Sequence, residues 1–213
     1  MNTMSTRIQT RKEELANGIS HVLGILFCLI GIPFLIAKAN EGHNFVTVTS
    51  VIVFGIGMLL VYTFSTLYHL AQKEKKKQVL KIADHICIYY LIAGTYSPLM
   101  IAYLDKKTAL VFLGIMWLIV LFGTFFKVFY VDRFRFVSVM MYVLMGWMIV
   151  FVLKPLLEVM PMSVFLWIVA GGISYSVGVY FYMKSYKKYF HVIWHFFVLL
   201  GTIFHYIAIL KSL

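Results

Sequence analysis

The sequence predicts an all-α integral membrane protein in which seven transmembrane helices form one domain over residues 1–213. The composition supports this class, because 62% of the residues are hydrophobic and only 13% are charged, whereas soluble domains average roughly 45–50% and about 25%. Apolar stretches recur along the chain, and each approaches or exceeds the roughly 20 residues that cross a bilayer as a helix. The alternating ten-residue segments of a membrane β-barrel are absent.

Each predicted helix is an apolar stretch whose backbone would satisfy its own hydrogen bonds within the segment. The seven helices are expected at about residues 15–37, 46–70, 82–104, 109–131, 134–153, 161–183 and 190–210. Basic residues mark the connections, at Lys38, Lys73–Lys81, Lys106 and Lys107, Arg133 and Arg135, Lys154, and Lys184–Lys188. The connections are short, so we expect consecutive helices to be antiparallel neighbours.

The distribution of Lys and Arg predicts how the bundle is oriented. The N-terminus and the even-numbered loops carry 14 of the 19 basic residues, and the opposite side carries 5. Because basic loops remain in the cytoplasm, we expect a cytoplasmic N-terminus, an external C-terminus and a place in the cell membrane. The net charge of +11 therefore indicates anionic lipid headgroups rather than a nucleic acid as the partner.

Polar residues of the second and third helices are predicted to meet near the cytoplasmic face. His69 lies near the inner end of the second helix, and Ser65 lies one turn deeper on the same face. Asp84 and His85 stand at the expected start of the third helix, although His85 points about 100° away from Asp84. Asp84 also has a simpler interpretation, as a negative charge stabilised by the dipole at that helix start.

The seventh and first helices add polar residues at the same depth. His191 and His195 occupy the first two turns of the seventh helix at a spacing that points both imidazoles the same way. Glu14, Asn17 and His21 share one face of the first helix, and we expect them to support the site or the fold rather than to bind a metal. Ionisable residues inside membrane spans are costly and usually face the bundle interior, so their common depth indicates a site.

Three imidazoles, from His69, His191 and His195, match the donor set of a catalytic zinc site, which leaves a fourth position to water. Asp84 would orient a ligating histidine or hydrogen-bond that water, and Ser65 would do the latter. The simpler alternative is a chance pair of interfacial histidines that contact headgroups. His205, roughly 15 Å deeper, is expected to be a core residue. His43 is expected in an outer loop, and Cys28 and Cys87 as buried residues without a disulfide.

Five segments together resemble the haemolysin III family, which belongs to the progestin and adipoQ receptor group. They are Glu14-Leu15-Ala16-Asn17 with His21, Ser65-Thr66-Leu67-Tyr68-His69, Asp84, Ala93-Gly94-Thr95-Tyr96, and His191-Val192-Ile193-Trp194-His195. The resemblance implies seven helices, a cytoplasmic N-terminus and a zinc ion held by His69, His191 and His195. It also implies that Asp84 and Ser65 lie near the water on that ion.

The resemblance leaves three functions open. The first is a zinc-dependent hydrolase of a lipid amide or ester, since the group is similar to alkaline ceramidases; Asp84 would be the general base and Ser65 would position water or the developing oxyanion. The second is a pore-forming or haemolytic protein, after the name of the bacterial members. The third is a membrane regulator with structural zinc. A membrane lipid is the expected substrate or ligand in the first case, and no oligomeric state is predicted.

Overall fold

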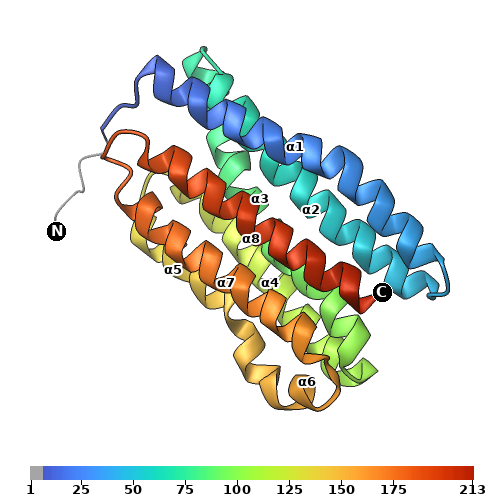
Figure 1. Cartoon of the computed structure of the whole chain (residues 1–213). Helices are drawn as coiled ribbons and strands as arrows, with labels where there is room; N and C mark the ends of the chain where they lie inside the picture. The colour runs from blue at the N-terminus through green and yellow to red at the C-terminus, as the bar shows by residue number, and fades with distance from the viewer. Residues whose placement is uncertain (1–6) are drawn as a thin grey trace.

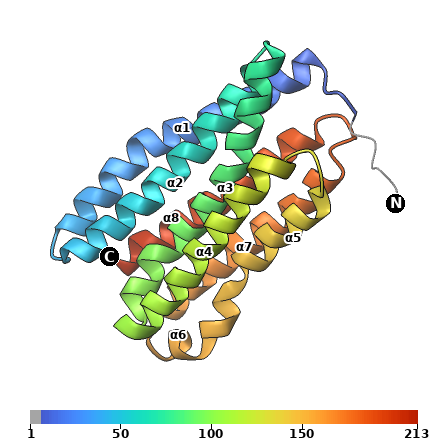
Figure 2. The same cartoon turned by 180° about the vertical axis from the view of Figure 1, so that it is seen from behind.

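Long apolar helices make up the part of the chain that the structure, a computed structural model, describes: residues 7–213 (Figures 1 and 2). Seven spans in this part are long and apolar enough to cross a membrane, and it contains no strand, which confirms the predicted fold class. The elements are α1 (Arg11–Asn40), α2 (Phe45–Leu70), α3 (Glu74–Tyr103), α4 (Lys106–Tyr130), α5 (Arg135–Gly146), the 3-10 helix η1 (Met148–Val152), α6 (Leu153–Val159), α7 (Met162–Met183) and α8 (Phe190–Ser212).

Polar caps explain where three of the helices begin. Thr10 and Glu13 form a reciprocal capping box at the start of α1. The Asn44 side chain accepts a hydrogen bond from the Thr47 amide at the start of α2. Asp105 does the same for α4, and its hydrogen bonds from Thr108 and Lys107 hold the pKa of this carboxyl below its ordinary value.

The third helix is longer than the sequence pattern predicted. We expected it to begin near residue 82, but α3 begins at Glu74, because its first two turns are charged and lie outside the apolar stretch that hydropathy detects. Asp84 therefore lies in the third turn of α3. The interpretation of Asp84 as a charge at a helix N-terminus is wrong, since the dipole effect fades within the first turn.

The fifth span is broken where a continuous helix over 134–153 was expected. It continues to Val159, but α5 ends at Gly146 and η1 begins at Met148. The Tyr96 hydroxyl donates to the Gly146 carbonyl at 2.6 Å and accepts from the Ile149 amide at 3.2 Å. Tyr96 thus satisfies backbone groups that the break would leave unpaired within the membrane. The first span is also longer than expected at both ends.

Helix α3 lies in the middle of the bundle and packs against both α2 and α4, while α1 packs between α2 and α8 and α7 lies beside α8 (Figures 1 and 2). The starts of α1, α3, α5 and α8 and the ends of α2, α4 and α7 share one end of the bundle, which we call the proximal end. The C-terminus lies at the other end (Figure 1). Which end faces the cytoplasm stays a prediction.

Candidate metal centre

Three histidines converge at the proximal end, between α2 and α8. His69 comes from the last turn of α2, and His191 and His195 come from the first two turns of α8. One ring nitrogen from each lies within 4.8 Å of the other two, which is close enough for all three to hold a single ion. His69 and His195 are buried, and His191 is half-buried beside the ring of Tyr182.

His69 is held in place through its Nδ1 atom. The Oε2 atom of Glu14 lies 2.7 Å from this nitrogen, and the other oxygen of Glu14 lies 2.9 Å from Nζ of Lys77. A carboxylate can only accept, so the hydrogen-bonded Nδ1 of His69 carries the proton and Nε2 keeps its lone pair. A carboxylate behind a histidine in this way is the usual support of a metal-binding imidazole.

His195 has an equivalent support from the backbone of α1. Its Nδ1 atom lies 3.2 Å from the Asn17 carbonyl oxygen and 2.9 Å from Oγ of Ser20. The carbonyl accepts, so Nδ1 of His195 also carries the proton and its Nε2 is the free donor of an electron pair. The side-chain amide of Asn17 approaches Nδ1 of His69 at 3.4 Å, so Asn17 touches both histidines.

The buried Nε2 atom of His69 tests whether these residues suit a metal ion. It is inaccessible to solvent and has no hydrogen-bond partner among the described residues. An unpaired buried nitrogen costs free energy unless something binds it. The rings of His191 and His195 both lie 5.1 Å from that of His69, centroid to centroid, so the unpaired Nε2 lone pair fits a cation such as zinc.

Asp84 and Ser65 lie beside the histidines. Ser65 is buried one turn deeper than His69 on α2, and Asp84 on α3 is close enough to interact with the Ser65 hydroxyl and with His69. The Asp84 carboxylate is also 3.7 Å from Nδ1 of His85, and its side chain is 15% exposed. The structure thus brings a carboxylate and a hydroxyl to the α3 side of the three imidazoles.

His21 is a fourth imidazole next to this group. Its ring centroid lies 3.8 Å from that of His195, and it is 3% exposed. Neither ring nitrogen of His21 has a hydrogen-bond partner in the described residues. His205, in contrast, points Nε2 at the Ile168 carbonyl at 3.1 Å, far along α8 from the site.

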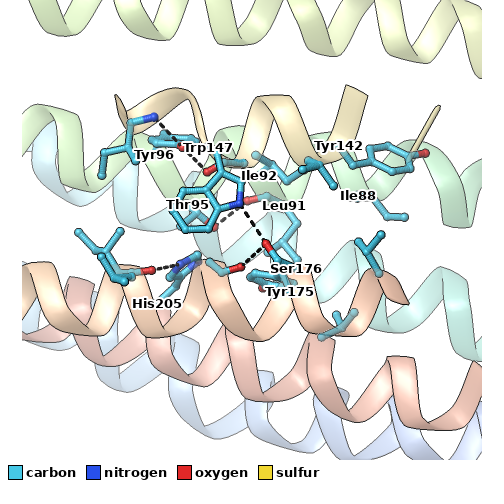
Figure 3. Close-up of a pocket in the computed structure, with 18 of the residues that line it drawn as sticks. Ile88, Leu91, Ile92, Thr95, Tyr96, Tyr142, Trp147, Tyr175, Ser176 and His205 are labelled. Carbon is cyan, nitrogen blue, oxygen red and sulfur yellow. Dashed lines mark hydrogen bonds between the residues drawn. The ribbon is translucent and has the colours of Figure 1, made fainter. Parts of the chain in front are cut away.

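An apolar cavity lies in the bundle between α3, α5, α7 and α8 (Figure 3). Ile88 and Trp194 line its proximal part, and they stand four residues after Asp84 and one before His195. Thr95, Tyr175 and His205 line the deeper part. A mostly apolar cavity whose lining comes within one helical turn of a polar cluster suits a ligand with an apolar tail.

All eight residues that the sequence analysis selected lie around this one place at the proximal end. They are Glu14, Asn17, His21, Ser65, His69, Asp84, His191 and His195. Ser20 and Lys77, which contact His195 and Glu14, were not predicted from the sequence. The position of Ser20, three residues after Asn17 on the same helix, was a usable signal. Cys28 and Cys87 are buried and unpaired, as expected.

The family model described as haemolysin-III related matches residues 9–206 of this chain. The chain therefore belongs to this family. Among curated proteins, it is 40% identical to a hemolysin-3 homolog of Bacillus subtilis over 91% of both chains, and 37% identical to hemolysin-3 of Bacillus cereus over 97% of this chain and 94% of that one. It is also 25% identical to the human monocyte to macrophage differentiation factor over 94% and 84%. No solved structure matches significantly. The family and the seven spans make this a multi-pass protein of the cell membrane.

Proposed function

We propose that this protein is a zinc-dependent hydrolase that cleaves a lipid amide or ester at the proximal end of the bundle. The observation that carries the proposal is the arrangement of His69, His191 and His195, two of them supported through Nδ1, beside the carboxylate of Asp84. A structural zinc site is usually closed by four protein ligands, whereas a three-ligand set leaves one position for chemistry.

The residues of this chain would divide the reaction as follows. Zinc, when bound, supplies a Lewis acid that polarises a carbonyl group and makes water more acidic. Asp84 accepts the proton of the attacking water and later returns it to the leaving amine or alkoxide. The Ser65 hydroxyl donates a hydrogen bond to the substrate carbonyl oxygen as negative charge develops there.

The apolar cavity supports a lipid substrate. Its lining between Ile88 and His205 is mostly apolar. Because Ile88 follows Asp84 by one turn of α3, we expect an acyl chain in the cavity to direct its carbonyl end toward Asp84. Glu14, Asn17 and Ser20 do not take part in the chemistry. They hold the imidazoles in position, which is the requirement for a metal centre of fixed geometry.

Purified protein in detergent tests this function with a fluorescent ceramide as the amide and a phospholipid as the ester. We expect zinc-dependent turnover of one of them, and we expect Asp84→Asn to lower kcat by roughly 10²–10⁴-fold while zinc content stays at one ion per chain. Asp105→Asn at the distal end is the matched control and should retain activity. A zinc-loaded protein that cleaves neither lipid would instead indicate a regulator with structural zinc.

A haemolytic pore is the second candidate, because two relatives carry the name hemolysin-3 or its homolog. Liposomes that contain the purified protein and an entrapped dye separate the candidates. Dye release that persists in the Asp84→Asn variant would favour the pore over the hydrolase.

A further inference from the structure

A lysine is buried near the proximal end of α4 without a counter-ion in contact. Lys127 is 1% exposed, and among residues 7–213 its ammonium makes no hydrogen bond and no ion pair. Its Nζ atom lies over the ring of Tyr142 on α5, 5.8 Å from the ring centroid. A buried charge is strongly destabilising unless something pairs with it, so Lys127 requires an explanation.

Charged groups of both signs surround Lys127, but none of them pairs with it. The ammonium of Lys127 is close enough to interact with four charged groups: Lys81 on α3, Arg135 on α5, Asp84 and Asp132. Lys81 is neutralised by Asp132, with which it forms an ion pair. Asp84 makes no ion pair with Lys127 in the described part of the chain, so the ammonium of Lys127 has no anion in direct contact.

Arg135 does not use its charge on a carboxylate either. Its guanidinium stacks 4.4 Å from the centroid of the Tyr182 ring and donates to the Tyr182 carbonyl and to Oγ of Ser185 at 2.8 Å. Both of these acceptors are neutral. Two cations, Lys127 and Arg135, therefore face this region from α4 and α5 without an anion in contact.

Hydrogen-bond donors in the same cluster are also unpaired. Nε of Arg135 and Oγ of Ser138 are inaccessible to solvent and have no partner in the described residues, and Ser138 is 1% exposed. Arg135, Ser138 and Tyr142 are spaced by three and four on α5, so they share a face. The helix itself begins without a side-chain cap, which adds unpaired amide groups nearby.

We propose that Lys127, Arg135 and Ser138, here called the donor cluster, bind a phosphate group. The cluster offers an ammonium, a guanidinium nitrogen and a hydroxyl from two helices, and a phosphate oxyanion accepts several charge-assisted hydrogen bonds at once. Lys81 and Arg135 are partly exposed, so the phosphate reaches the cluster from the proximal surface. At the proximal ends of the helices, this phosphate comes either from a lipid headgroup or from solution.

Binding is tested with protein purified in a phosphate-free detergent and three probes, measured by calorimetric titration. The probes are a short-chain phosphatidic acid, the diacylglycerol with the same chains, and inorganic phosphate. We expect the phosphatidic acid to bind and the diacylglycerol to bind at least tenfold more weakly. Equal affinity for inorganic phosphate would assign the site to free phosphate, and a preference for phosphatidic acid would assign it to the lipid.

Variants of Lys127 connect the binding to the cluster. Lys127→Met should weaken phosphate binding roughly 10–100-fold, the range for lost hydrogen bonds to a charged group. Lys127→Arg keeps the charge and should bind within a few-fold of the wild type, which shows that the loss is not a packing defect. Lys184→Met, at the same end of the bundle, is the matched control.

Without phosphate, Lys127→Met should melt at or above the temperature of the wild type, because it removes an uncompensated buried charge. The proposal is overturned if the wild type binds neither phosphate probe, or if Lys127→Met and Lys184→Met bind phosphatidic acid with the same affinity. Both outcomes are independent of lipid hydrolysis, so the donor cluster can fail while the proposed function stands.

Discussion

The carboxylate of Glu14 contacts two residues of other helices, His69 on α2 and Lys77 on α3. Because both of its oxygens are engaged, the side chain is fixed, and it fixes the imidazole plane of His69 in turn. Asn17 and Ser20, on the same face of α1, do the same for His195. At the residue scale, the first helix therefore serves as the support of histidines that come from α2 and α8.

Replacing Glu14 tests this support. Glu14→Gln should lower zinc affinity roughly 10–100-fold, the usual effect of removing an outer hydrogen-bond partner of a ligating histidine, because the neutral amide holds the imidazole less firmly. The measurement is a competition titration with a chromogenic chelator. The control is Glu158→Gln, the same chemical change at an exposed residue of the distal end. It should leave the zinc affinity unchanged. Unchanged affinity in Glu14→Gln would contradict the role of Glu14.

The residues of the site were predictable to a large extent, and the reason is physical. Helix depth follows from sequence position at 1.5 Å per residue, so the levels of His69, Asp84, His191 and His195 could be placed from the seven apolar stretches alone. Side-chain contacts between helices do not follow from depth. The ion pair of Glu14 with Lys77 and the burial of Lys127 depend on rotation about each helix axis, which a nearly all-apolar stretch does not reveal.

At the scale of elements, α2 and α3 approach each other closely enough to require glycine. A Cβ atom at Gly57 would lie 3.0 Å from the Tyr90 carbonyl oxygen and 3.1 Å from the Leu91 Cα. One at Gly94 would lie 3.1 Å from the Val53 carbonyl oxygen. Because these neighbours are backbone atoms, they cannot rotate away, and the small residues set the distance between α2 and α3.

Gly57→Ala should therefore push α2 from α3 and lower the melting temperature by several degrees, the range for a loss of about 1–3 kcal/mol through overpacking. The shift is measured by thermal unfolding in detergent. Gly114→Ala is the control, since nothing lies within 4 Å of a Cβ atom there. If both variants melt together with the wild type, the helix contact is looser than this account requires.

The elements also show where sequence patterns fail. Hydropathy measures how apolar a segment is. It therefore located the apolar part of α3 but not its charged first turns, Glu74–Lys81. It could not detect the break after Gly146 either, because all five residues of η1 are apolar. The break depends on the Tyr96 hydroxyl, a long-range partner that no local pattern identifies.

At the scale of the whole molecule, orientation in the membrane remains to be measured. The 14 basic residues of the proximal side predict that this end is cytoplasmic. His43→Cys lies in an exposed distal loop and Lys73→Cys in an exposed proximal one, while Cys28 and Cys87 are buried. A membrane-impermeant maleimide should label His43→Cys in intact cells and Lys73→Cys only after permeabilisation. The reverse labelling would contradict the predicted orientation.

The stability of the whole bundle should also depend on a metal ion bound by the three imidazoles. A ligand that binds the folded state stabilises it, and the three imidazoles join α2 to α8, which are distant in sequence. Removing zinc with a chelator should lower the melting temperature, and adding zinc back should restore it. A melting temperature that is independent of both treatments would mean that no metal links these helices.

The most direct measurement is the zinc content of the purified protein by mass spectrometry, for the wild type and for His69→Ala, His191→Ala, His195→Ala and the distal control His43→Ala. We expect one zinc ion per chain in the wild type and in the control, and a near-complete loss in each of the other three variants, together with lower thermal stability. Full zinc occupancy in those three variants, or none in the wild type, would contradict it.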